Sequence, residues 1–235
     1  MSHGSKRWPA SIWLQLLPQA LTILDEGLKA GNEWSFGGGT ALALHLKHRI
    51  SYDIDIFLHS GRVRDLTPYK CEATKRILGD RKFQYPGNYL KLELQGGEID
   101  FLQISPLTDD PYVWMSINGR EVPVETPSEI IAKKIAYRSS EFKLRDIFDL
   151  SCALRADPDF MDAAIPELSH TLPLLKSRLE FLIPVYEAMI LNEVNPLPGG
   201  RASMSKSAIE LCLEATDGWI NSLSPVTEPP DPDIP

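Results

Sequence analysis

Apolar and polar residues alternate over residues 53–58, and this pattern predicts a strand. Side chains two residues apart on a strand share one face. One face of this strand is therefore apolar, with Ile54, Ile56 and Leu58. The other carries Asp53, Asp55 and Phe57. Two carboxylates that project side by side repel one another unless a cation lies between them. Such a pair suits Mg²⁺, which prefers one or two carboxylates together with substrate phosphates.

A glycine turn precedes this strand along the chain. Residues 34–36 form a short apolar segment, Gly38 and Gly39 follow it, and residues 40–47 show a helical pattern. A strand, a tight turn and a helix start place backbone N–H groups where they can face an anion. A phosphate site beside a metal-binding pair of acids indicates nucleotidyl transfer.

A third acid lies on a later strand. Residues 88–94 and 98–104 alternate, and Gly96–Gly97 is the predicted two-residue hairpin turn between them. Asp100 shares a strand face with Leu102 and Ile104. A carboxylate on an apolar face is costly unless it is paired or bound to a metal. Asp100 is therefore either a strand-end residue in contact with water or a third carboxylate of the metal site.

Two helices are predicted after the sheet. Residues 126–129 (TPSE) form a capping box, so a helix begins there and runs to about residue 139, and a second helix covers about residues 143–156. The apolar stripe of the first helix predicts that Lys134 lies at the edge of the buried face and that Lys133 is solvated. On the second helix, Arg145 and Asp149 are spaced for an ordinary surface ion pair, worth only a few tenths of a kcal/mol.

Length and composition predict the organisation of the chain. Its 235 residues suffice for a core over residues 7–125, a helical C-terminal domain over 126–223 and a proline-rich disordered tail over 224–235. No apolar run approaches eighteen residues, so no membrane helix is expected. The three cysteines include no CxxC pair, which favours reduced thiols in a cytoplasmic protein.

Charge bears on the choice of partner. The net charge of −8 gives no global basic field for nucleic acid. The basic residues between positions 70 and 82 are either a solvated face or a local patch for a nucleic-acid acceptor. The absence of a GxxxxGK[ST] segment excludes a P-loop kinase or GTPase.

The run GGGTALALHLKHRISYDIDIF resembles the signature of the DNA polymerase β-like nucleotidyltransferases. More narrowly, it is similar to the AbiEii/AbiGii-type toxin nucleotidyltransferases of bacterial toxin–antitoxin systems. Lys134, Arg138 and the segment RDIFD at residues 145–149 fit the lysine and the Arg-Asp-x-x-Asp of that family. The resemblance implies an α+β fold: a mixed sheet flanked by helices, with a C-terminal helical bundle.

The resemblance also implies roles for individual residues. Two Mg²⁺ ions are expected on Asp53, Asp55 and Asp100, and Asp100 is also expected to accept the proton of the acceptor hydroxyl. Lys134 completes the catalytic set by its charge on the triphosphate. The expected nucleotide-binding residues are Gly38, Gly39, Thr40, Arg49, Ser51, Lys134, Arg138 and Asp146. Two alternatives stay open: Arg49 and Arg138 contact phosphate or pair with an acid, and Ser51 binds the nucleotide or caps a turn.

The implied reaction moves a nucleoside monophosphate from an NTP to an acceptor hydroxyl. The expected acceptor is a tRNA 3′ end and the expected protein partner is a cognate antitoxin, with no membrane involved. A protein acceptor, a small-molecule acceptor and a non-catalytic partner-binding module are the alternatives, because the fold alone does not decide among them.

Overall fold

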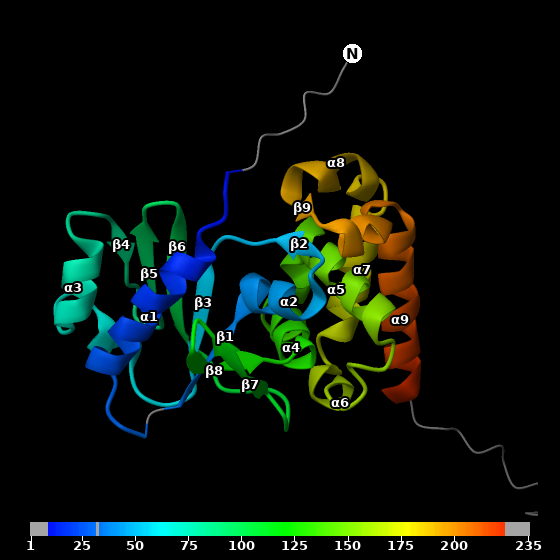
Figure 1. The fold of residues 1–235 in the computed structure, drawn as a ribbon. Helices are drawn as coiled ribbons and strands as arrows, with labels where there is room; N and C mark the ends of the chain where they lie inside the picture. The colour runs from blue at the N-terminus through cyan, green and yellow to red at the C-terminus, as the bar shows by residue number, and fades with distance from the viewer. Residues whose placement is uncertain (1–8, 32, 224–235) are drawn as a thin grey trace, which may run out of the picture.

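The computed structural model describes residues 9–31 and 33–223, so the predicted tail over 224–235 lies outside the described residues. A half built around a β-sheet stands beside a half built of helices (Figure 1). This arrangement agrees with the expected α+β fold.

The sheet has seven strands in the order β4-β5-β6-β3-β1-β8-β7. Strands β3 and β6 pair in parallel, as do β1 and β8, and the other pairs are antiparallel, so the sheet is mixed. The strands are β1 (Trp34–Gly37), β3 (Ile54–Leu58), β4 (Phe83–Gln84), β5 (Tyr89–Leu94), β6 (Gly97–Gln103), β7 (Tyr112–Ile117) and β8 (Arg120–Glu125).

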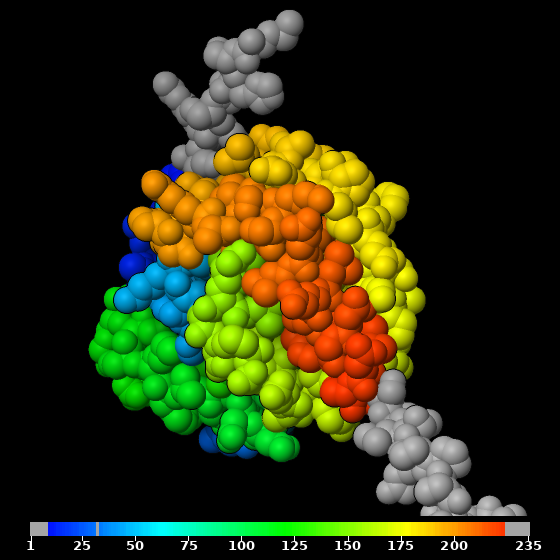
Figure 2. Space-filling view, turned by 90° about the vertical axis from the view of Figure 1, so that its right-hand side faces the viewer, coloured from blue at the N-terminus to red at the C-terminus, as the bar shows by residue number. Residues whose placement is uncertain are grey.

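Helices cover the sheet and form the second half. The helices of the sheet half are α1 (Trp13–Gly27), α2 (Gly38–Leu46), the 3₁₀ turn η1 (Val63–Leu66) and α3 (Glu72–Leu78). The remaining elements are α4 (Pro127–Arg138), η2 (Ser139–Glu141), α5 (Leu144–Ala156), α6 (Ile165–Leu168), α7 (Leu172–Leu182), α8 (Tyr186–Glu193), η3 (Pro198–Met204) and α9 (Ser207–Leu223). Figure 2 shows α7, α8 and α9, in yellow, orange and red, on one face of the helical half.

The two faces of the sheet have different partners, as the alternation predicts. Phe36 of β1 lies opposite Ile56 of β3, and Phe36 stacks on Trp13 of α1 with ring centroids 6.3 Å apart. Helix α1 therefore covers the apolar face. The opposite face, which carries Asp55, is left for the site.

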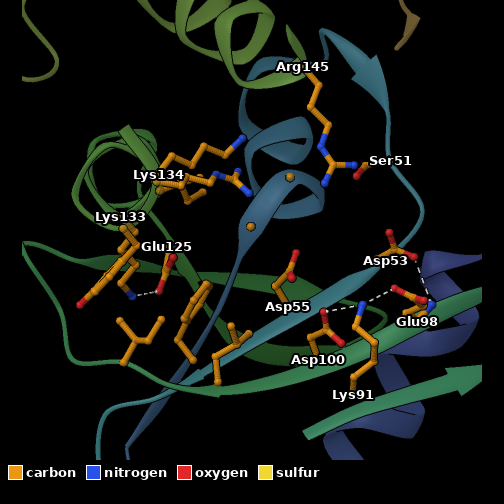
Figure 3. Close-up of a pocket in the computed structure, with 18 of the residues that line it drawn as sticks. Ser51, Asp53, Asp55, Lys91, Glu98, Asp100, Glu125, Lys133, Lys134 and Arg145 are labelled. Atoms are coloured by element: carbon orange, nitrogen blue, oxygen red, sulfur yellow. Dashed lines mark hydrogen bonds and ion pairs between the residues drawn. The ribbon is translucent and has the colours of Figure 1, made fainter. Parts of the chain in front are cut away.

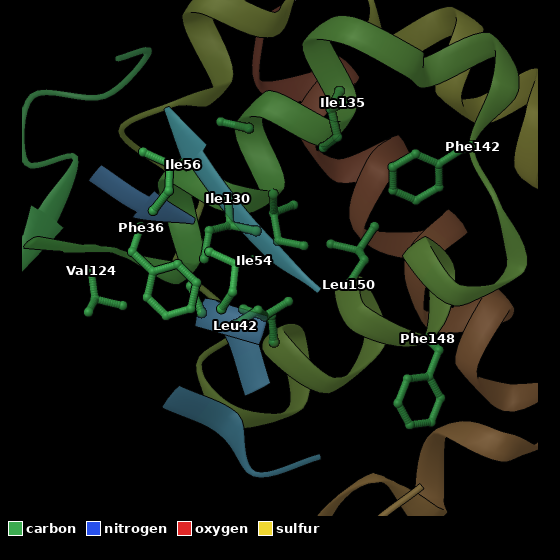
Figure 4. Packing of buried hydrophobic residues seen from close by; sticks show 14 of the residues in the cluster. Phe36, Leu42, Ile54, Ile56, Val124, Ile130, Ile135, Phe142, Phe148 and Leu150 are labelled. Atoms are coloured by element: carbon green, nitrogen blue, oxygen red, sulfur yellow. The ribbon is translucent and has the colours of Figure 1, made fainter. Parts of the chain in front are cut away.

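A continuous core joins the two halves (Figure 4). Ile54 and Ile56 of the sheet, Leu42 of α2, Ile130 of α4 and Leu150 of α5 are all fully or almost fully buried in it. In addition, the short strand β2 (Arg49–Ile50) pairs with β9 (Asn195–Pro196) in the C-terminal part. Apolar packing therefore crosses residue 125, where the predicted core domain ends, and it holds the first helices of the C-terminal part against α2.

The hairpin between β5 and β6 differs from its prediction. Leu94 pairs with Gly97, so the turn residues are Gln95 and Gly96, with Gly96 at φ +89°. A turn at Gly96–Gly97 would have placed Glu93 opposite Asp100. The observed register places Lys91 opposite Asp100 instead. Shifting a hairpin by one residue in this way changes every cross-strand partner.

Candidate active site

A row of four register neighbours crosses the face of the sheet opposite α1. Lys91 of β5 lies opposite Asp100 of β6, Asp100 beside Asp55 of β3, and Asp55 opposite Gly37 of β1. Neighbouring strands are about 4.8 Å apart, so the two carboxylates lie side by side. Asp53 precedes β3 by one residue and completes the predicted acidic group.

The glycines allow helix α2 to begin directly above this row. Gly38 has φ +68°, and a Cβ atom there would collide with the Asp55 carboxylate. A Cβ atom at Gly39 would collide with the Arg49 guanidinium. Because both positions lack a side chain, the N-terminus of α2 and its free backbone N–H groups lie next to the acids.

These residues surround a cavity of about 300 Å³ (Figure 3). Nine of the eleven predicted site residues line it: Gly38, Gly39, Arg49, Ser51, Asp53, Asp55, Asp100, Lys134 and Arg138. The structure thus brings together residues from positions 38 to 138. Thr40 and Asp146 do not line the cavity.

Burial and mutual repulsion disfavour the charged form of the carboxylates. Burial, and next the charge of Asp53, raise the pKa of Asp55. Burial, and next the charge of Asp55, raise the pKa of Asp100 to about 7. Asp53 Oδ1 accepts a hydrogen bond from the backbone N–H of Glu98 at 3.1 Å. Asp100 Oδ1 is buried and has no hydrogen-bond partner among the described residues. A cation beside the carboxylates would relieve their mutual repulsion.

The fit to metal ions is therefore partial. Paired carboxylate oxygens suit a hard divalent cation that shares its remaining positions with phosphate and water. However, within residues 9–31 and 33–223 no three His, Cys, Asp or Glu side chains lie together in positions to hold a metal ion. The residues fit an ion bound by one or two carboxylates and by substrate oxygens, and they do not form a complete protein cage.

Lys134 is not placed as the sequence predicts. It is buried, and its Nζ donates to Asp149 Oδ2 at 2.5 Å and to Asp146 Oδ1 at 3.0 Å, both on α5. Its ammonium therefore ties α4 to α5 in the cavity wall. The prediction that this side chain lies at the edge of the buried face is wrong, because Lys134 is buried. It does line the cavity, and its expected role on the triphosphate stays a prediction.

The prediction that Lys133 is solvated is also wrong. Its Nζ donates to Glu125 Oε1 at 2.5 Å and lies 3.0 Å from Glu129 Oε1. The ammonium also sits 4.1 Å from the centroid of the Phe57 ring. Acids on β8 and α4 draw this lysine inward, which helical periodicity alone cannot show.

Asp149 is the centre of a buried ion cluster. It accepts from Arg49 Nε at 2.7 Å, Arg49 Nη2 at 3.0 Å, His48 Nε2 at 2.8 Å and Lys134. Burial alone would raise the pKa of Asp149, but the positive charges of Arg49 and Lys134 outweigh it and hold the pKa well below the usual range. The alternative of an ordinary surface pair between Asp149 and Arg145 is not what the structure shows, because Asp149 is buried and paired with Arg49, His48 and Lys134. Arg49 follows the second of its two alternatives and frames the pocket.

The side chains of Asp146 and Thr40 have partners within the protein, and the nucleotide contacts expected of these two residues stay a prediction. Asp146 is fully buried and accepts from Lys134, from Arg138 Nη2 at 2.6 Å and from the backbone N–H of Lys143 at 3.1 Å, which caps α5. The Thr40 hydroxyl donates to the carbonyl oxygen of Asp53 at 2.5 Å. Thr40 therefore positions the acidic strand, and Asp146 holds the cations behind the cavity.

Five charged residues that line the cavity were not predicted as site residues: Lys91, Glu98, Glu125, Lys133 and Arg145. Lys91 lies on the polar face of an alternating strand, so the alternation could have predicted that it faces the site. The alternation could not predict that its partner is Asp100. Arg145 is exposed, lies near Ser51 (Figure 3), and makes no hydrogen bond or ion pair within the described part of the chain. It precedes Asp146 on α5, and adjacent helical residues point about 100° apart.

A family model now decides the identity of this fold and site. The model of the nucleotidyl transferase AbiEii toxin, of type IV toxin–antitoxin systems, matches residues 23–180, more than half of the chain. The chain belongs to the AbiEii nucleotidyltransferase toxin family. This confirms the resemblance drawn from the glycine pair and the DxD, and the chain is a nucleotidyltransferase in class.

Solved structures resemble this AbiEii-family chain over most of its length. JHP933 from Helicobacter pylori is 18% identical, with a TM-score of 0.50, over 89% of this chain and 90% of that one. A protein of H. pylori described as a nucleotidyltransferase is also 18% identical, with a TM-score of 0.49, over 89% and 93% of the two chains. At such identities the likeness concerns the fold alone, and the predicted nucleotidyltransferase fold is confirmed.

No curated protein matches the AbiEii-family chain. Among the described residues, no helix is both long enough and apolar enough to cross a bilayer.

Proposed function

We propose that this protein transfers a nucleoside monophosphate from an NTP to an acceptor hydroxyl in a Mg²⁺-dependent reaction. The observation that carries the proposal is the adjacent pair Asp55 and Asp100 beneath the N-terminus of α2, inside a cavity that also carries Arg145. Carboxylates, oriented N–H groups and a free guanidinium are the groups that a metal-bound triphosphate requires.

The chain's own residues divide into two sets. Backbone N–H groups at Gly38, Gly39 and Thr40 face the phosphates, and Arg145, which lies near Ser51 on the same side of the cavity, supplies a positive charge (Figure 3). Asp53 and Asp55 would hold Mg²⁺, which neutralises phosphate charge and polarises the phosphoryl group when it is bound. Ser51 lines the cavity beside Gly39, where its hydroxyl is in place to bind a phosphate oxygen.

Asp100 is the proposed proton acceptor. The acceptor oxygen attacks the α-phosphorus, a new P–O bond forms, and the bond from that phosphorus to the bridging β-phosphate oxygen breaks. Pyrophosphate leaves with the bonding electron pair, and the hydroxyl proton passes to Asp100. The pKa of Asp100, raised to about 7, suits a general base at neutral pH.

The family description supports a proposal for the biological role. We infer that the protein is a toxin that modifies tRNA 3′ ends, that an antitoxin protein is its partner, and that it acts in the cytoplasm. The family description, which names a type IV toxin–antitoxin system, supports the toxin role and the partner.

The experiment that tests the function uses the four α-³²P-labelled NTPs in turn, with total tRNA and total protein as acceptors. Wild type should label the tRNA fraction in the presence of Mg²⁺, and Asp55→Asn should not. Label in the protein fraction would assign a protein acceptor, and label in neither fraction, with any NTP, would refute transfer to a macromolecule.

A further inference from the structure

Lys91 holds the third carboxylate of the site. Its Nζ lies 3.2 Å from Asp100 Oδ2 and 2.5 Å from Glu98 Oε2. The lysine side chain is only 25% exposed, and Asp100 is 21% exposed. The ammonium is therefore enclosed between two acids at the edge of the cavity, as Figure 3 shows by the dashed lines that join the three residues.

The same lysine belongs to a chain of polar contacts that links Asp100 to Asp53. Lys91 binds Asp100 and Glu98, and the backbone N–H of Glu98 binds Asp53 Oδ1. Asp53 and Asp100 each therefore have one carboxylate oxygen that is already engaged by the protein. The strand register favours this arrangement, because Lys91 is the direct cross-strand neighbour of Asp100.

This arrangement is compatible with one divalent ion and unfavourable for a second. An ion between Asp53 and Asp55 meets carboxylate oxygens that no lysine contacts in the described structure. A second ion on the Asp100 side would have to displace the ammonium from Asp100 Oδ2 or bind close to it, and like charges repel strongly in a partly buried site. Within the described ranges 9–31 and 33–223, no three side chains that could bind a metal lie together, which agrees with an ion held by two carboxylates.

We propose that Lys91 is a resident cation that takes the place of the second magnesium ion. On this proposal, which rests on the function proposed above, the site binds one divalent ion per nucleotide, at Asp53 and Asp55. Lys91 remains on Asp100, neutralises its charge and holds the carboxylate in the orientation that receives the proton. Lys91 is thus a positioning residue for Asp100. The two-ion site expected from the sequence is replaced by one ion and one ammonium.

The test counts bound ions without requiring turnover. Mn²⁺ serves as the probe, with the α,β-methylene analogues of ATP, CTP, GTP and UTP, which cannot be cleaved at the reacting bond. Equilibrium dialysis with elemental analysis gives the Mn²⁺ bound per bound nucleotide. Electron paramagnetic resonance separates an isolated Mn²⁺ from a coupled pair. The variants are Lys91→Met, Lys91→Arg and, as the matched control, Lys75→Met, an exposed lysine of α3 that lies 3.9 Å from Glu72.

One ion per nucleotide is expected for wild type, Lys91→Arg and Lys75→Met, and two for Lys91→Met, because the position on Asp100 becomes vacant. Transfer by Lys91→Met at low Mg²⁺ should fall on the order of 10²-fold, as expected when one preorganised charge is removed, and should recover partly at high Mg²⁺. Lys75→Met should show neither change.

Three outcomes would overturn the proposal in different ways. Two ions per nucleotide in wild type, which needs no variant, would refute it and leave the proposed function intact. A single ion in folded Lys91→Met would show that the ammonium does not exclude the second one. If wild type bound no Mn²⁺ with any of the four analogues, the proposed function itself would fail, and this inference with it.

Discussion

Arg49 and Asp149, one hundred positions apart, form a two-point ion pair inside the protein. Arg49 Nε donates to Oδ1 at 2.7 Å and Arg49 Nη2 donates to Oδ2 at 3.0 Å, while the Asp149 side chain is fully buried. This pair joins the segment that leads into the acidic strand to helix α5. The guanidinium also fills the space left by Gly39. The shape of the phosphate side of the cavity therefore depends on a carboxylate that does not itself line the cavity.

Asp149→Asn should destabilise the whole protein. The substitution leaves Arg49, Lys134 and His48 around a neutral amide, and breaking one partner of a buried pair costs about 3–5 kcal/mol. Thermal and urea unfolding measure the effect. The matched control is Asp217→Asn, which removes an exposed acid paired with Lys176 and should change stability by less than about 1 kcal/mol. A wild-type melting temperature for Asp149→Asn would mean that the cluster does not support the fold.

Gly38→Ala should abolish transfer for a reason beyond backbone strain. Gly38 has φ +68° and faces the Asp55 carboxylate, so a methyl group must displace that side chain. Gly119→Ala is the control, because Gly119 has φ +76° but no atom within 4 Å of the added Cβ. Both variants should lose about 1–2 kcal/mol of stability from the left-handed backbone conformation. Only Gly38→Ala should lose transfer, by about 10²-fold or more, and equal activity in the two variants would contradict the close approach of α2 to Asp55.

Arg145→Met should weaken nucleotide binding without affecting the fold. The guanidinium lines the cavity, is exposed and makes no ion pair within the described residues. Its removal should raise the Kd for the nonhydrolysable NTP analogues about tenfold, equivalent to about 1.4 kcal/mol. The change in stability should stay within about 0.5 kcal/mol. Arg155→Met, an exposed arginine on the same helix that bonds Ser207, should change neither quantity. Calorimetry that finds the same affinity in wild type and Arg145→Met would exclude this contact.

The contribution of Asp100 to the stability of the metal-free protein should be lost as the pH rises from about 4 to about 7. Burial raises the pKa of Asp100 from 3.8 to about 7, so the folded state holds a proton that the unfolded state has released. The stabilisation is therefore complete below pH 3.8 and is lost as the pH rises through 7. Unfolding in urea at pH 5 and pH 8, with EDTA present, measures the difference. Asp100→Asn should reduce the slope without removing it, because burial also raises the pKa of Glu125 to about 7. A slope of wild-type size in Asp100→Asn would show that Asp100 is ionised at both pH values.

Local patterns determined the elements that carry the acids. The alternation of residues 53–58 predicts a strand with both aspartates on one face. The glycine at position 38 predicts a turn into a helix, and the positive φ of Gly38 in the structure is one that other residues rarely adopt. The capping box predicts the start of α4, where the Thr126 hydroxyl accepts from the Glu129 N–H at 3.3 Å. These features depend on groups only a few residues apart, so the sequence alone carries them.

Partners across the fold were decided by the tertiary structure. Helical spacing separates Lys133 from Lys134 by about 100° but does not show that acids on β8 and α5 surround both of them. The hairpin register, which places Lys91 and not Glu93 opposite Asp100, depends on which glycine occupies the turn, and two adjacent glycines fit it equally well. The charge of a buried side chain is set by neighbours distant in sequence. For that reason the sequence alone predicted that Asp53, Asp55 and Asp100 lie together, whereas it did not predict which lysine and arginine side chains lie beside them.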